Sequence, residues 1–140
     1  MTLMAIGRTP EVWAAAVSQY GIIDWLTMLE HSDPQLREYE ISKLGDPIKD
    51  RKVYIDSSPI TYIRKATAPL LVLQGNNDVR VPKEEAEQVV RVMQEHHQTV
   101  SAHFYPDEGH GFFKRENRVD ALERTLAWFD QYLKHPSATH

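Results

Sequence analysis

Two residues of this chain combine a type and a position that acid–base chemistry requires. Asp78 follows the apolar run 70–73 in LLVLQGNNDVRVP, and His110 follows the alternating stretch 100–105 in FYPDEGHGFF. A carboxylate beside an imidazole fixes the tautomer of the ring and stabilises the imidazolium that forms when histidine accepts a hydroxyl proton. Asp78 and His110 are therefore candidates for a catalytic acid and base.

A simpler role has to be weighed against this interpretation. An aspartate after a strand is usually a turn former or a helix cap, and this is the default for an isolated Asn-Asn-Asp. Glycines on both sides of His110 change the balance, because they let the loop turn sharply and leave room for a substrate. Taken together and in this order, Asp78 and His110 favour the acid–base interpretation.

The serine that such a pair would activate is missing from the chain. α/β-Hydrolases use the order Ser, Asp, His, and their nucleophile elbow is G-x-S-x-G, because small residues are needed around its strained turn. Ser18 comes closest, but Ala16 and Tyr20 stand at the flanking glycine positions. Ser57 and Ser58 precede a proline and are expected to be turn or cap residues.

The candidate acid and base need strands whose ends lie side by side. The continuous apolar character of residues 70–74 predicts a strand covered on both faces, as in parallel sheets. A short apolar run at 12–17 and the alternation at 100–105 predict two further strands. Neighbouring strands lie about 4.8 Å apart, so loops after adjacent strands can bring Asp78 and His110 within hydrogen-bonding range.

Helices are expected between and after these strands. Apolar spacing, prolines and first-turn acids predict helices at residues 1–8, 25–30, 34–44, 59–64 and 82–97, and a last amphipathic helix carries Val119, Leu122, Leu126, Phe129 and Leu133 on one side. The first helix has no capping residue before it. Alternation of strands and helices favours a parallel sheet with helices packed on its faces, and ligands bind such sheets at the carboxyl ends of the strands.

Composition excludes several classes of function. The 140 residues are 41% hydrophobic and 26% charged, as in one soluble globular domain, and contain no cysteine, which rules out thiol catalysis and cysteine-ligated zinc. The net charge is −4 and acidic and basic residues are interleaved along the chain, which argues against nucleic acid or membrane partners. The pair His96-His97 lacks further metal ligands, so we expect no metal and no cofactor. No targeting signal is visible, and the compartment stays open with the cytoplasm slightly favoured.

Several stretches resemble one peptidase family over most of the chain. LLVLQGNNDVRVP, GDP, SSPITYI and FYPDEGHGFFKRENRVDALERTLAWFDQYL are similar to the C-terminal part of the catalytic domain of prolyl oligopeptidase family serine peptidases, on the dipeptidyl and acylaminoacyl peptidase side. The resemblance implies an incomplete three-layer α/β-hydrolase-like parallel sheet, the C-terminal half of the domain, over residues 1–134, followed by a tail at 135–140. MTLMA resembles the helix after the family's nucleophile motif, which implies that the serine lies shortly before Met1.

The resemblance also implies roles for individual residues. Asp78 matches the triad acid and His110 the triad base. Arg80 matches a position whose side chain often contacts a substrate carbonyl, although a solvated arginine or an ion pair with Glu84 or Glu85 is the simpler alternative. Ile23 and Trp25 match the region that lines the pocket for the residue before the cut bond. At Gln74 the family commonly has histidine, and we expect this departure to affect packing more than catalysis.

The first functional hypothesis is a fragment of a serine peptidase. It would cleave peptide or acyl-peptide bonds in the full-length parent, with a peptide as substrate, and the 140-residue chain alone would be inactive because the nucleophile lies outside it. A second hypothesis is a non-catalytic α/β domain that associates through an exposed sheet edge, either with the missing N-terminal half or as a homo-oligomer. An esterase-type α/β-hydrolase is a third.

Overall fold

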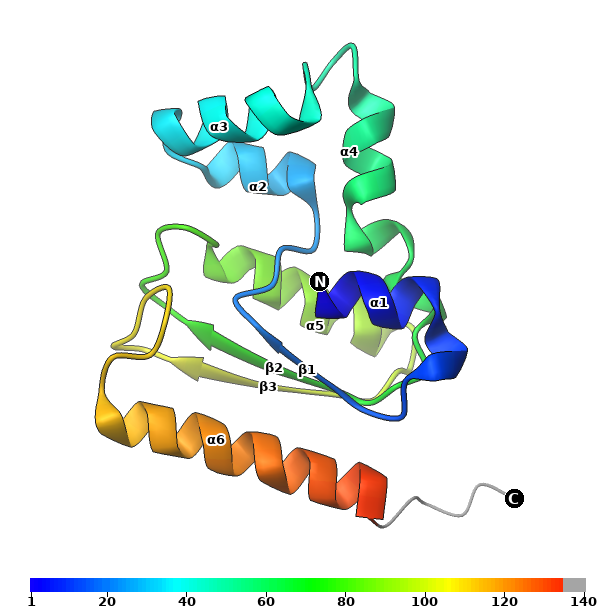
Figure 1. Cartoon of the computed structure of the whole chain (residues 1–140), viewed down its shortest axis with the longest axis vertical. Coiled ribbons are helices and arrows are strands. Elements are labelled where there is room, and N and C mark those ends of the chain that lie inside the picture. The colour runs from blue at the N-terminus through cyan, green and yellow to red at the C-terminus, as the bar shows by residue number, and fades with distance from the viewer. Residues whose placement is uncertain (135–140) are drawn as a thin grey trace.

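The computed structural model describes residues 1–134, which fold around a three-stranded parallel sheet (Figure 1). The strands are β1 (Ala16–Gln19), β2 (Leu70–Gly75) and β3 (Val100–Tyr105), in the spatial order β1-β2-β3. The central strand, β2, pairs with β1 over residues 70–73 and with β3 over its whole length. Because the sheet is parallel, all three carboxyl ends open on the same edge.

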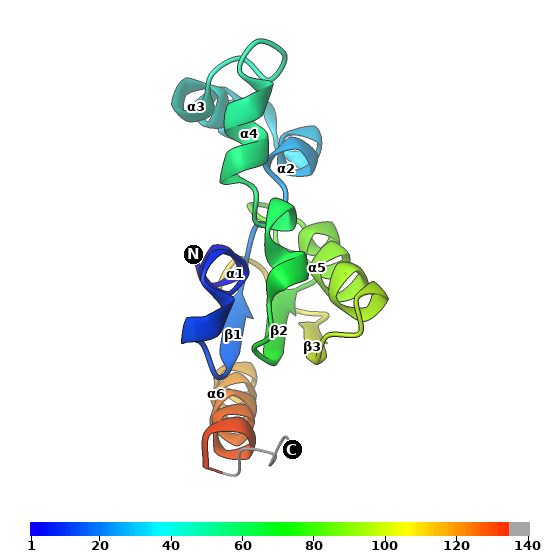
Figure 2. The same cartoon turned by 90° about the vertical axis from the view of Figure 1, so that its right-hand side faces the viewer.

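Helices cover both faces of the sheet and give three layers (Figures 1 and 2). On one face lie α1 (Thr2–Arg8) and α5 (Lys83–Glu95), and on the other lies α6 (Arg115–Phe129). Three further helices project beyond the layer of α1 and α5: α2 (Trp25–His31), α3 (Pro34–Leu44) and α4 (Arg51–Ser57). No helix within residues 1–134 is long and apolar enough to cross a membrane.

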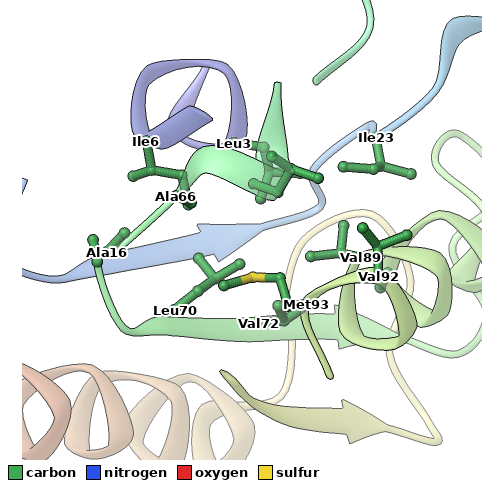
Figure 3. Close-up of a cluster of buried hydrophobic side chains, with 13 residues drawn as sticks. Leu3, Ile6, Ala16, Ile23, Ala66, Leu70, Val72, Val89, Val92 and Met93 are labelled. Atoms are coloured by element: carbon green, nitrogen blue, oxygen red, sulfur yellow. The ribbon is translucent and has the colours of Figure 1, made fainter. Parts of the chain in front are cut away.

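The main core lies between the sheet and the layer of α1 and α5 (Figure 3). Every residue of β2 is buried, because Leu70 and Val72 point into this core while Leu71 and Leu73 point into a second, smaller cluster on the α6 side. The continuous apolar run is thus the sequence of a strand enclosed on both faces, as predicted.

Most predicted elements are present, with shifted boundaries. α2 and α3 lie where the sequence places them, whereas the first strand starts later than expected, at Ala16, because Pro10–Val12 forms a 3₁₀ turn. The helix expected at 59–64 is instead two 3₁₀ turns, Pro59–Thr61 and Ile63–Lys65. The predicted tail at 135–140 lies outside the described residues.

The orientation of the last helix differs from the prediction. Val119, Leu122, Leu126 and Leu133, which the sequence places on the apolar side of an amphipathic helix, have 44% to 59% of their surface exposed, whereas Ala121 is buried. Two hydrogen bonds anchor the opposite side of α6 to the sheet: Tyr105 donates to Asp120, and Trp128 donates to the carbonyl of Pro69. These polar contacts decide which side of α6 faces the sheet, and apolar spacing alone does not reveal them.

Candidate active site

Asp78 and His110 meet at the carboxyl edge of the sheet. Oδ2 of Asp78 lies 2.9 Å from Nδ1 of His110, although the residues are 32 positions apart in sequence. Asp78 comes from the loop after β2 and His110 from the loop after β3, and these strands pair directly up to Gly75 and Tyr105. The carboxylate is fully buried, whereas 39% of the imidazole side chain is exposed. The convergence expected from the sequence is therefore observed.

The carboxylate of Asp78 is held by four donors. Oδ1 accepts the N–H groups of Arg80, at 2.9 Å, and Val81, at 2.8 Å. Oδ2 accepts from Nε2 of Gln74, at 3.2 Å, and faces Nδ1 of His110. A carboxylate has about four acceptor sites, so each one has a partner here. Asp78 is fixed in the orientation that places one oxygen against the imidazole.

Gly75 allows the two loops to touch. A Cβ atom at this position would lie 2.4 Å from the carbonyl oxygen of Gly109 and 2.5 Å from that of Glu108. Backbone hydrogen bonds connect the same segments, from Asn76 to Tyr105 and from Asn77 to Glu108. A side chain at position 75 would force the loops apart, and with them the acid and the base.

A buried glutamate fixes the far side of the His110 loop. The carboxylate of Glu108 accepts the N–H groups of Phe113 and Lys114 and the side-chain amide of Asn117. The hydrogen bond from Phe113, followed by that from Asn117, holds the pKa of Glu108 below its usual value. Glu108 was not among the predicted site residues, although it is the second acid of the DEGHG stretch and lies two residues before the histidine.

Tyr20 directly follows the edge strand β1, at its carboxyl end. Its ring centroid is 5.1 Å from that of His110 and 5.1 Å from that of Phe112. Its φ of 54° is in the left-handed region, which is uncommon for a bulky residue and often marks a functional turn. In the sequence Tyr20 stands out only because it occupies a glycine position of the nucleophile elbow, but its place just after a strand also indicates a site position.

A pocket of about 310 Å³ opens beside His110. Trp25 and Arg80 line it together with His110, so three of the predicted site residues share one cavity. The remaining lining is mainly apolar and aromatic and comprises Tyr20, Ile22, Met28, Leu36, Tyr39, Glu40 and Val81. Trp25 also lines a second cavity of about 250 Å³ beside the start of α1.

Ile22, and not the predicted Ile23, lines the pocket beside His110. The side chain of Ile23 is fully buried in the main core, and Ile22 lines the cavities instead. The backbone explains this placement, because Oε2 of Glu85 accepts the N–H groups of Ile23, at 2.9 Å, and Asp24, at 3.0 Å. Burial raises the pKa of Glu85. Glu85 thus anchors the segment that carries Trp25.

The other predicted features have simple outcomes. Within residues 1–134 Arg80 forms no ion pair, so the expected alternative of a bridge to Glu84 or Glu85 is not seen. In the same part of the chain, no serine hydrogen-bonds to His110, and Ser18 is buried. No group of three metal-ligating side chains occurs among the described residues.

Comparison with known proteins identifies the family. The prolyl oligopeptidase family model matches residues 1–136. The chain belongs to this family. A solved Mycobacterium tuberculosis puromycin-hydrolyzing peptidase superposes with a TM-score of 0.88 at 30% identity, over 94% of this chain and 20% of that one. An acylaminoacyl peptidase solved with a chloromethyl ketone superposes with a TM-score of 0.86 at 25% identity, over the whole chain and 23% of that one.

Curated relatives of this prolyl oligopeptidase family chain include two kinds of exopeptidase by name. Dipeptidyl aminopeptidase BIII of Pseudoxanthomonas mexicana is 36% identical over 83% of this chain and 18% of its own length. The human acylamino-acid-releasing enzyme is 27% identical over 91% of this chain and 18% of its own length. The chain thus spans about a fifth of these relatives. The predicted α/β-hydrolase-like fold and family are confirmed.

Proposed function

We propose that this chain supplies the acid–base pair and part of the substrate pocket of a serine peptidase. In this proposal, His110 accepts the proton of a serine hydroxyl and later donates it to the leaving amine, and Asp78 stabilises the imidazolium in between. The observation that carries the proposal is the 2.9 Å contact between Nδ1 of His110 and the buried, fully hydrogen-bonded carboxylate of Asp78. The exposed imidazole lines a pocket and can therefore meet a substrate.

The pocket beside His110 suits a peptide substrate. Trp25 and Ile22 offer an apolar wall for the side chain of the residue before the cut bond. Arg80 has no ion-pair partner within residues 1–134 and lines the same cavity, which supports the proposal that its guanidinium donates to a substrate carbonyl. Together with the relatives' names, these features favour cleavage of peptide or acyl-peptide bonds by the full-length protein.

Catalysis requires a nucleophile from another segment. The chain contains no G-x-S-x-G, and Ser18, the nearest match, is buried and does not contact His110. We therefore include in the proposal that the 140-residue chain alone is inactive. Loss of the attacking group in a triad typically lowers turnover by about a millionfold.

A complementation experiment tests this function. The chain would be fused behind the N-terminal part of the Mycobacterium tuberculosis relative, up to and including its nucleophile motif, and assayed with dipeptidyl, acylaminoacyl and ester substrates. We expect amide hydrolysis that falls by about 10⁴ with Asp78→Asn and by about 10⁶ with His110→Ala. A folded fusion whose activity survives His110→Ala would contradict the proposal, and a fusion that cleaves only esters would favour an esterase.

The outer edge of β1 supports a second candidate function, association with another polypeptide. Ala16 and Tyr20 donate toward β2, so the alternation of a parallel strand directs the backbone groups of Val17 and Gln19 away from it. An apolar cavity of about 280 Å³, lined in part by Ala5, Trp13 and Phe129, flanks this edge. An open edge of this kind pairs with a further strand, from a preceding segment or from a second copy. A monomer at high concentration in sedimentation velocity would argue against self-association.

A further inference from the structure

We propose that Gln74 is a positioning residue of the acid–base pair, because its side-chain amide fixes the carboxylate of Asp78 in the plane from which Oδ2 meets His110. This inference rests on the proposed function of Asp78 and His110. It also changes the expectation from the sequence, in which Gln74 in place of the family's common histidine was a matter of packing.

The contacts of Gln74 connect the strand to the catalytic loop. Its side chain is fully buried near the end of β2. Nε2 lies 3.2 Å from Oδ2 of Asp78, 2.9 Å from the carbonyl oxygen of Val81 and 3.3 Å from that of Gly75. One side-chain amide thus contacts Gly75, where the strand ends and the loop begins, the carboxylate of Asp78, and Val81 near the end of the loop. This amide is attached to the central strand, which pairs with a neighbour on each side.

Gln74 supplies the constraint that the backbone donors do not. The N–H groups of Arg80 and Val81 both bind Oδ1, so they fix that oxygen but leave the carboxylate free to swing about it. Nε2 of Gln74 binds the other oxygen. Three donors on two oxygens define the plane of the carboxylate, and the remaining acceptor site faces Nδ1 of His110.

The orientation of the amide carries an energetic cost that packing does not explain. Oε1 of Gln74 is buried without a hydrogen-bond partner among the described residues, and such an acceptor costs about 1–3 kcal/mol. A methionine of similar shape would avoid this cost. The reversed amide would place Oε1 against a carboxylate and two carbonyls, so the donating orientation is the only favourable one. Donation by Nε2 is what the glutamine provides.

Gln98 offers a matched control. Its Nε2 also donates to three oxygens, the carbonyls of Ile63, Arg64 and Ala66, and its Oε1 is also buried without a partner within residues 1–134. It precedes β3 and therefore lies at the amino end of the sheet, away from Asp78. Gln98→Met removes an equivalent set of hydrogen bonds without touching the candidate site.

The test measures the Nδ1 proton of His110 by NMR in the 140-residue chain. In the wild type we expect a low-field resonance for this proton. In Gln74→Met we expect the proton to exchange with solvent at least about tenfold faster, because one hydrogen bond to a charged group is worth that factor. The imidazole of this variant should also populate a mixture of tautomers. Gln98→Met should lower the melting temperature but leave the resonance unchanged. Gln74→His, which restores a donor, should return exchange toward the wild-type rate.

Asp78→Asn separates failure of this inference from failure of the proposed function. If Asp78→Asn leaves the Nδ1 proton unaffected, the acid–base pair itself is overturned. If Asp78→Asn alters it but a folded Gln74→Met does not, only the role of Gln74 is overturned. If Gln74→Met does not fold, the side-chain amide resonances of Gln74 provide the test. We expect Asp78→Asn to shift the resonances of Gln74 and to leave those of Gln98 at their wild-type positions. Unshifted Gln74 resonances would refute the inference.

Discussion

Single side chains at this site act by fixing other groups. Asp78 is enclosed and accepts four hydrogen bonds, Glu108 binds the backbone after His110, and Glu85 binds the backbone before Trp25. Each carboxylate holds a loop that would otherwise have free N–H groups. The precision of the site therefore depends on buried acids that a substrate does not touch, and on one position where no side chain fits.

Gly75→Ala should separate the acid from the base. The added methyl group would overlap backbone oxygens of Glu108 and Gly109, which cannot give way without moving the loop. We expect a loss of about 1–3 kcal/mol in the free energy of unfolding, measured in urea, and loss of the His110 Nδ1 resonance. Gly109→Ala is the control, because its Cβ would come no closer than 3.4 Å to another residue. Equal stability of both variants would contradict the prediction.

Glu85 should give an unusual dependence of stability on pH. Its folded pKa is raised above 4.5, mainly by burial, so the unfolded chain loses its proton first as the pH rises. Its contribution to the free energy of unfolding is therefore greatest below the unfolded pKa and is lost as the pH rises through the folded pKa. Glu85→Gln, measured by urea denaturation at pH 4 and 7, should gain stability relative to wild type at the higher pH.

The alanine variant separates charge from hydrogen bonding. Glu85→Ala leaves the buried N–H of Ile23 and the N–H of Asp24 without their acceptor and should cost about 1–3 kcal/mol at either pH. Glu40, whose pKa burial also raises, stays in both variants and leaves a residual slope of the same sign. A Glu85→Gln variant as unstable as Glu85→Ala would refute the proposed effect of charge.

The sequence alone singles out the two residues proposed to carry the chemistry of the site, but not those that support them. Asp78 and His110 stand out because glycines and strand ends surround them. The contacts of Glu85 and Gln98 join residues more than 30 positions apart, so no local pattern announces them. The placement of Ile23 in the core has the same origin, since its backbone N–H donates to Glu85 of a distant helix, and Ile22 lines the pocket.

At the scale of elements, polar anchors and open surfaces decide how helices are placed. The helix α4 was not predicted, because only one of its seven residues, Tyr54, is buried and no apolar pattern marks it. The hydroxyl of Tyr54 donates a hydrogen bond to the carbonyl of Gly45. For α6 the helix was predicted, but most of its apolar stripe is exposed and the opposite side contacts the sheet. The central strand, by contrast, follows from the sequence, because a strand buried on both faces is encoded by a continuous apolar run.

The exposed side of α6 predicts opposite effects for neighbouring substitutions. Leu122→Glu should change the free energy of unfolding by less than about 0.5 kcal/mol, because the side chain is 59% exposed. Ala121→Glu, one residue earlier, buries a charge against the second core cluster and should prevent stable folding. Urea denaturation checks both variants. If Leu122→Glu also unfolds the chain, the orientation of α6 is not the one described.

At the scale of the whole molecule, the contact between Asp78 and His110 forms in a structure that includes no nucleophile motif. Asp78, His110 and their supports lie within residues 70–117, while the match to relatives covers about a fifth of their length. The pair should form in the 140-residue chain, and turnover should require a serine from outside it.

Labelling with a fluorophosphonate checks this separation. The 140-residue chain should remain unlabelled, because no serine of residues 1–134 hydrogen-bonds to His110. The fusion described above should be labelled at the serine of its nucleophile motif, and His110→Ala should slow labelling. Covalent modification of the chain by itself, located by mass spectrometry, would reveal a nucleophile that we have not recognised.

The two sides of the pocket are attached to different parts of the molecule. His110 and Arg80 come from loops rooted in β2 and β3, whereas Met28, Leu36 and Tyr39 come from the helices α2 and α3 that project from the sheet (Figure 1). Variation in those helices can reshape the cavity without disturbing the imidazole. Substitutions in α2 and α3 should therefore alter which side chains the pocket accepts while leaving the contact between Asp78 and His110 intact.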